Sequence, residues 1–341
     1  MTETKTARPS RITTDVPFDK DGKHHGFLRL LHSVHRSAYG YIPIPITVIR
    51  NGEGPTVYLN SGNHGDEYEG QVTLMRLTRE LQPSDLKGRV IILSASNFPA
   101  VMAGMRTSPI DEGNLNRSFP GDPDGTPTQK IAHYIESELL PRADYAFDLH
   151  SGGSSLHYVA SGLARRFDEP EKHKAIVDML DYFGAPVSFL STSPQGGDQT
   201  LTGGAARNNV LHIGTELGGS GQVTPAILKI AEAGVRRLLD YCGVTARPLG
   251  DGKKPGTRLM YVGGTNFYVY APENGLFEPT VELGDMVKAG DLGGLIHYPD
   301  TPWREPAEAR FEHDGMVICK RTPGRTERGD CLFHLGADLA R

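Results

Sequence analysis

The sequence has little cysteine, no long apolar run and no block of charge of one sign. Its 341 residues include three cysteines, Cys242, Cys319 and Cys331, which are widely spaced and form no CxxC pair. An odd, scattered set argues against a disulfide framework and against a thiolate zinc site. The net charge is −5 without a long single-sign run, so we expect neither nucleic acid nor an anionic membrane as a partner.

The sequence also lacks a membrane-spanning stretch and a secretory signal. No apolar stretch approaches the roughly 20 residues that span a bilayer. The first residues, MTETKTARPSRITTDVPF, lack the apolar core of a secretory signal. We therefore expect a cytoplasmic protein that does not bind membranes. Its oligomeric state stays open, and a homo-oligomer is compatible with the sequence.

Apolar residues in the first two thirds of the chain alternate between strand and helix patterns. Strands are expected at 46–50, 56–60, 89–96, 143–150 and 210–219, and helices at 71–82, 127–141, 172–184 and 224–243. The strand–helix–strand order over 56–96 is typical of a βαβ unit with parallel strands. The NGEGP segment between the first two strands predicts a hairpin.

Composition divides the chain into three parts. Residues 1–25 are polar, and residues 26–246 carry the alternating pattern that predicts an α/β domain. After the linker-like stretch RPLGDGKKPGT, residues 257–341 are rich in glycine and β-forming residues with regular turn signals. This last part is expected to form a small all-β domain.

Reactive side chains follow three of the expected strands. TVYLN leads into SGNHGDEYEG with His64 and Glu67, the strand 143–150 ends at His150, and VLHIGTELGG carries Glu216. In an α/β sheet the carboxyl ends of the strands form the ligand site. Two histidines and a glutamate are the ligand set of a catalytic zinc, with the fourth position left to water. We therefore expect one zinc per chain on His64, Glu67 and His150, with Glu216 as general base. Histidine and carboxylate ligands also suit other divalent metals.

A loop at 105–121, MRTSPIDEGNLNRSFPG, supplies candidates for substrate binding. Arginine is suited to bidentate recognition of a carboxylate. We expect Asn116 and Arg117 to bind a substrate carboxylate, and Arg106 to polarise the scissile carbonyl.

Four ordered motifs carry a family resemblance: GNHGDE (62–67), NLNRSFPG (114–121), DLHSGG (148–153) and TELGG (215–219). Together they resemble the succinylglutamate desuccinylase/aspartoacylase family, a branch of the zinc carboxypeptidase fold. The resemblance implies a zinc-carboxypeptidase-like mixed sheet flanked by helices, followed by a small C-terminal all-β domain. It also implies the same roles for the site residues named above.

Within the family, the chain is most similar to deacetylases of N-alpha-acetyl-L-2,4-diaminobutyrate in ectoine breakdown. Such a substrate, a small N-acyl amino acid, has a free side-chain amine that an acidic group should meet. Asp198, Asp111 and Glu112 are candidates by loop position, with Asp198 taken as the substrate-binding residue. Three other functions stay open: a deacylase of the aspartoacylase or desuccinylase type, a carboxypeptidase, and a non-catalytic binding module.

Overall fold

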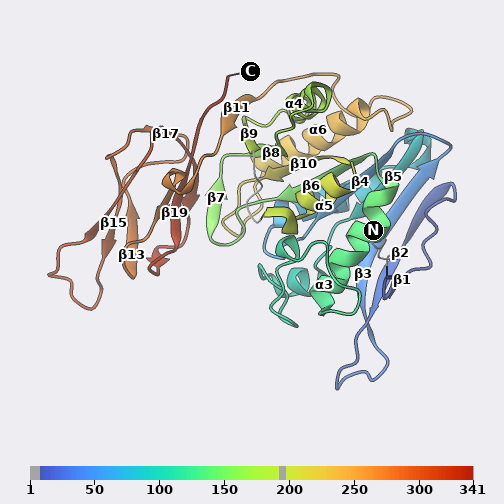
Figure 1. Ribbon diagram of the computed structural model, residues 1–341, viewed down its shortest axis with the longest axis horizontal. Coiled ribbons are helices and arrows are strands. Elements are labelled where there is room, and N and C mark those ends of the chain that lie inside the picture. The colour runs from blue at the N-terminus through green and yellow to red at the C-terminus, as the bar shows by residue number, and fades with distance from the viewer. Residues whose placement is uncertain (1–7, 192–196, 341) are drawn as a thin grey trace, which may run out of the picture.

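The computed structural model describes residues 8–191 and 197–340. Within them, one large mixed sheet runs through the α/β part and continues into the C-terminal strands (Figure 1). Its strands, in order across the sheet, are β1 (Ile12–Thr13), β2 (Gly22–Leu31), β3 (Tyr41–Asn51), β5 (Gly88–Leu93), β4 (Thr56–Ser61), β6 (Tyr145–His150), β10 (Leu211–Glu216), β8 (Ser161–Arg165), β9 (Val187–Ser191), β11 (Arg258–Tyr261), β19 (Cys331–Asp338), β17 (Gly315–Arg321) and β14 (Met286–Val287). Off this path, β12 (Tyr268–Tyr270) pairs with β19 and β7 (Leu156–Tyr158) pairs with β17.

Helices cover both faces of the α/β part of this sheet. They are α1 (Tyr68–Glu80), α2 (Phe98–Ala103), α3 (Pro127–Tyr134), α4 (Pro170–Phe183), α5 (Leu201–Arg207) and α6 (Pro225–Tyr241). Apolar residues of α1, α4 and α6 form one buried cluster with β4 and β6, while α3 and α5 share a second cluster with β2 and β3 on the opposite face. The cap of α6 follows from its sequence, because Thr224 accepts a hydrogen bond from the N–H of Ile227 and Pro225 begins the helix.

The βαβ prediction is confirmed, and the hairpin prediction is wrong. Strands β4 and β5 are parallel neighbours connected through α1. Strand β3 pairs with β5 and not with β4, so β5 lies between the two strands that NGEGP connects. All six residues of β4 are buried, and this strand takes the central place between two parallel neighbours, β5 and β6. A pairing with β3 would have left β4 nearer the edge of the sheet.

The C-terminal strands continue the main sheet and add a second one. After the linker-like stretch, β11 pairs with both β9 and β19, so the main sheet is continuous across this region. A four-stranded antiparallel sheet comprises β16 (Ala307–Arg310), β15 (Leu292–His297), β13 (Gly275–Pro279) and β18 (Arg325–Thr326). Phe277, Phe311 and Phe333 pack between this sheet and β19.

The expected fold class, a mixed sheet flanked by helices with a small C-terminal β region, is confirmed. The C-terminal strands extend to one side of the α/β body (Figure 1). The division at residues 25, 246 and 257 remains a prediction. None of the described helices is long and apolar enough to cross a membrane.

Candidate active site

Three neighbouring strands deliver the expected metal ligands to one edge of the sheet. Strands β4, β6 and β10 lie side by side and parallel, so their carboxyl ends meet at the same edge. The loop after β4 carries His64 and Glu67, and β6 ends at His150. This loop packs closely against the backbone of α2. A Cβ atom added at Gly65 would stand only 2.0 Å from the carbonyl oxygen of Ala100. A glycine is required there by the close approach of the two backbones.

The ligand atoms of His64, Glu67 and His150 lie within 4.8 Å of one another. Nδ1 of His64 is 2.6 Å from Oε1 of Glu67, and Nδ1 of His150 is 2.7 Å from Oε2 of the same carboxylate. Burial alone would raise the pKa of Glu67, but the adjacent His64 and His150 outweigh it and hold that pKa well below its usual range. The cluster is therefore a buried, convergent set of two imidazoles around one carboxylate.

A second layer of side chains orients the two histidines. Nε2 of His150 lies 2.8 Å from Oδ2 of Asp148, whose carboxylate also accepts hydrogen bonds from Asn60 and Asn63. Nε2 of His64 lies 3.1 Å from Oδ1 of Asn114. Such partners fix the ring orientation of metal-binding histidines. Neither Asp148 nor Asn114 was predicted as a site residue. The signal for Asp148 was present, because residues two apart on a strand share a face.

Glu216 ends β10 directly beside His150. Its Oε2 atom is buried without a hydrogen-bond partner among the described residues. Burial, reinforced by the carboxylate of Glu67, raises the pKa of Glu216 well above its usual value. A carboxylate with a buried, unpartnered oxygen beside a metal-type cluster can take up and release a proton.

The loop 105–121 brings its candidates to the same place. Nη1 of Arg106 lies 3.4 Å from Oε1 of Glu67, and its side chain is half-exposed. Nδ2 of Asn116 lies 3.3 Å from Nε2 of His150. Arg117 is an exposed residue, and partial desolvation of its guanidinium together with the nearby Arg106 lowers its pKa. These three residues therefore surround the cluster with two cationic groups and one amide.

One cavity of about 490 Å³ joins all these groups. It is lined by His64, Glu67, Arg106, Asn116, Arg117, His150 and Glu216 at the metal-type cluster, and by residues of β8, β9, β10, α5 and the C-terminal strands elsewhere. The C-terminal wall includes Tyr268 and His334, whose rings are stacked with centroids 4.1 Å apart. Neither His334 nor His212, which also lines the cavity, was predicted as a site residue.

The three acidic candidates for a substrate amine are not among the described residues that line the cavity. The side chain of Asp198 is 79% exposed and lies 3.8 Å from Nη1 of Arg165. Asp111 instead accepts hydrogen bonds from the backbone and the hydroxyl of Thr128. Glu112 lies in the turn beside it with a positive φ of 55°.

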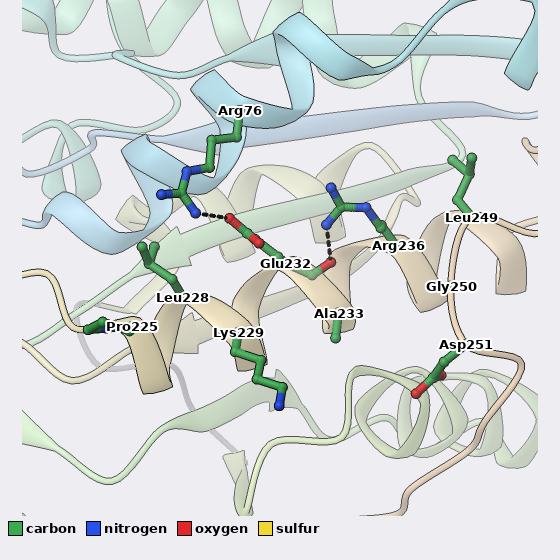
Figure 2. A pocket seen from close by; sticks show the side chains of 10 residues that line it. All are labelled: Arg76, Pro225, Leu228, Lys229, Glu232, Ala233, Arg236, Leu249, Gly250 and Asp251. Atoms are coloured by element: carbon green, nitrogen blue, oxygen red, sulfur yellow. Dashed lines mark hydrogen bonds and ion pairs between the residues drawn. The ribbon is translucent and has the colours of Figure 1, made fainter.

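A second hollow lies between α1 and α6, away from the cluster (Figure 2). One ion pair and one side chain–backbone hydrogen bond connect its lining residues (Figure 2). Nη1 of Arg76 lies 2.6 Å from Oε1 of Glu232, and Arg236 donates to the backbone carbonyl of Glu232. The hollow holds no cluster of metal-binding or nucleophilic side chains among its lining residues.

Comparison with known proteins identifies the family. Residues 53–242 match the succinylglutamate desuccinylase/aspartoacylase catalytic domain. Over 327 residues the chain is 39% identical to the N-alpha-acetyl-L-2,4-diaminobutyric acid deacetylase of Halomonas elongata. The alignment covers 95% of this chain and 94% of that protein. The chain belongs to the succinylglutamate desuccinylase/aspartoacylase family.

Solved structures share the fold of this desuccinylase/aspartoacylase family member. The product-bound ectoine utilization protein EutE (DoeB) of Ruegeria pomeroyi is 39% identical, with a TM-score of 0.92 over 97% of this chain and 99% of that one. A succinylglutamate desuccinylase/aspartoacylase of Rhodobacter sphaeroides is also 39% identical, with a TM-score of 0.90 over 97% of this chain and 100% of that one. The motif resemblance is confirmed, and the chain is a hydrolase of a deacylase family.

Proposed function

We propose that this enzyme is a zinc-dependent deacetylase that hydrolyses N-alpha-acetyl-L-2,4-diaminobutyrate to L-2,4-diaminobutyrate and acetate. One observation carries the chemistry: a His–Glu–His cluster and a carboxylate with one buried, unpartnered oxygen line the same cavity. The choice of substrate is supported by the name of the Halomonas elongata relative, whose alignment covers 95% of this chain.

The donor set fits one zinc ion. Two imidazole nitrogens and a carboxylate oxygen are the ligands of catalytic zinc sites, which leave a further position open. The residues that would hold it are His64, Glu67 and His150, with Asp148 and Asn114 behind the two histidines. Zinc in such a site supplies Lewis acidity, which activates water and polarises a carbonyl group.

Glu216 is the proton carrier of the proposed reaction. Its carboxylate takes a proton from the attacking water as the water oxygen bonds to the acyl carbon. It then gives this proton to the amide nitrogen as the carbon–nitrogen bond breaks, so that acetate and a free amine leave. Its raised pKa suits this role, because a proton held there is stable until the leaving group accepts it.

The arginine loop binds and orients the substrate in this proposal. Arg117 and Asn116 bind the α-carboxylate, since a guanidinium beside an amide matches the geometry of a carboxylate. Arg106 points its Nη1 at the ligand cluster, so its charge acts on the acyl oxygen as negative charge develops there.

A substrate panel tests the proposal. The purified zinc-loaded enzyme is given N-alpha-acetyl-L-2,4-diaminobutyrate, N-acetylaspartate and N-succinylglutamate, and kcat/KM is measured for each by release of the free amine. We expect the first substrate to be preferred by at least tenfold. A preference for either of the other two would replace the proposed substrate and keep the deacylase chemistry. No cleavage of any of the three would overturn the proposed substrate class.

A further inference from the structure

His212 lines the cavity from β10. It stands on β10, four residues before Glu216, with Gly214 between them. Alternate residues of a strand share a face, so all three border the same cavity. Four residues of strand correspond to about 13 Å.

The glycine between them keeps the floor open. A Cβ on Gly214 would come no nearer than 3.5 Å to its neighbours, the closest being the carbonyl oxygen of Asp148. The backbone therefore does not require a glycine at this position. A side chain on Gly214 would instead project into the cavity between His212 and Glu216.

The His212 ring is buried, and no described residue of the protein forms a hydrogen bond with it. Its exposed fraction is 6%, and neither Nδ1 nor Nε2 has a hydrogen-bond partner among the described residues. Burial lowers the pKa of His212 to about 4, so the ring is neutral and offers one N–H donor and one lone-pair acceptor. Buried polar groups in proteins are nearly always hydrogen-bonded. An imidazole that lines a cavity in this state is therefore suited to bind a polar group of a ligand.

Other charged groups around the cavity already have partners or belong to the reacting end. Among the described carboxylates of the wall, Glu67 and Asp148 contact the histidine rings, and Glu216 is the proposed proton carrier. Tyr268 and His334 also have unpartnered polar atoms, and their rings stack on each other. The cation that lines the cavity from β8, Arg165, is paired with Asp198.

We propose that His212 forms the subsite for the side-chain ammonium group of the substrate, accepting a hydrogen bond from it on one ring nitrogen. This inference rests on the proposed function. The carboxylate of Asp148 acts on His212 and favours a cation there, while the charge of the His150 imidazole acts in the opposite direction. The subsite explains how the cavity receives an amine although its lining offers no uncommitted carboxylate among the described residues.

The test compares two substrates of nearly equal shape that differ in the terminal group. N-alpha-acetyl-L-2,4-diaminobutyrate ends in an ammonium group, and N-acetyl-L-norvaline ends in a methyl group. For the zinc-loaded His212→Leu variant we expect kcat/KM to fall by about 10- to 100-fold on the first substrate, as for loss of a hydrogen bond to a charged group. The value for acetylnorvaline should stay within about threefold of the wild type. His212→Asn, which keeps an acceptor, should recover most of the loss.

A histidine outside the cavity provides the matched control. His133 on α3 does not line the cavity, and His133→Leu should leave the ratio of the two kcat/KM values unchanged. Equal losses of His212→Leu on both substrates, or no loss on either, would overturn the ammonium subsite and leave the deacylase function standing.

Binding of the free amino acids separates this inference from the proposed function. If the wild type cleaves neither substrate, the proposed function fails, and calorimetry with L-2,4-diaminobutyrate and L-norvaline then decides the subsite. We expect His212→Leu to bind diaminobutyrate at least tenfold more weakly than the wild type. Equal binding of diaminobutyrate by both proteins would overturn the subsite.

Discussion

Carboxylates that lie within a few ångströms of one another in this site have different surroundings. Glu67 is held between two imidazoles, which lower its pKa, whereas Glu216 is buried without a partner for Oε2, and its pKa is raised. Asp148 accepts hydrogen bonds from two amides and faces His150. In the proposed mechanism these surroundings suit three different roles, a metal ligand, a proton carrier and a positioning residue, although all three residues are acidic.

The proton-carrier role predicts the effect of Glu216→Gln. The amide keeps the shape of the side chain but cannot accept a proton at neutral pH, so kcat/KM should fall by about 10²–10⁴-fold. Zinc content should stay at the wild-type value, because Glu216 is not one of the proposed ligands. Glu312→Gln, on an exposed residue of the C-terminal region, serves as the control. Substantial activity of Glu216→Gln would remove Glu216 from the mechanism.

The positioning role of Asp148 predicts a different outcome. Asp148→Asn keeps the size of the side chain and weakens its interaction with Nε2 of His150, so zinc affinity should fall by about 10- to 100-fold. Activity should return when excess zinc is supplied. Competition with a chelator measures the affinity, and Asp300→Asn in an exposed turn is the control. An unchanged zinc affinity would show that Asp148 does not act through His150.

At the scale of elements, the contact between α1 and β6 sets the geometry of the metal-type cluster. Gly70 in the first turn of α1 faces β6 so closely that a Cβ would stand 2.6 Å from both Cβ and the carbonyl oxygen of Leu149. Leu149 is the neighbour of His150, and Glu67 directly precedes α1. The packing of α1 on β6 therefore fixes the separation of Glu67 and His150, two of the proposed metal ligands.

This contact predicts that Gly70→Ala lowers stability. The added methyl group forces the helix away from the strand, and the free energy of unfolding should fall by about 1–3 kcal/mol. Zinc affinity should fall with it. Urea unfolding of the metal-free protein measures the first effect. Gly324→Ala is the matched control, because a Cβ at Gly324 would contact nothing within 4 Å. Equal stability of the two variants would contradict the proposed role of the contact.

Local patterns located α1, α3, α4 and α6 and the strands β3, β4, β5, β6 and β10, but not β2, β8, β9, α2 or α5. Helical periodicity located α1 and α6, and the strand ends with His64, His150 and Glu216 identified the cluster now found around one cavity. The partner of β3 could not be read from NGEGP, because a turn does not specify which strand pairs with which. His212 and His334 were missed since an isolated histidine gives no signal before tertiary structure brings it to a cavity wall.

At the scale of the whole molecule, the C-terminal region completes both the sheet and the cavity. Strand β11 covers the edge of β9, and β7 of the α/β part pairs with β17 of the C-terminal part. Tyr268 and His334 form part of the cavity wall. The two predicted domains are therefore joined by strand pairing in two places, which a composition change near residue 250 does not reveal.

This continuity predicts the behaviour of a chain that ends at residue 246. Removal of β11 leaves β9 with an unpaired edge, and open edges promote association. We expect the truncated protein to aggregate or to unfold without a cooperative transition, as judged by size-exclusion chromatography and thermal circular dichroism. A monomeric, cooperatively melting fragment would instead support an independent α/β domain.

The most direct test of the account is a zinc titration of activity. The metal-free enzyme is mixed with increasing zinc, and acetate release from N-alpha-acetyl-L-2,4-diaminobutyrate is measured together with bound metal. We predict that activity rises in proportion to zinc and reaches its maximum at one zinc per chain, and that a chelator abolishes it. Full activity without metal, or one bound zinc with no acetate release, would contradict the proposal of a zinc-dependent deacetylase.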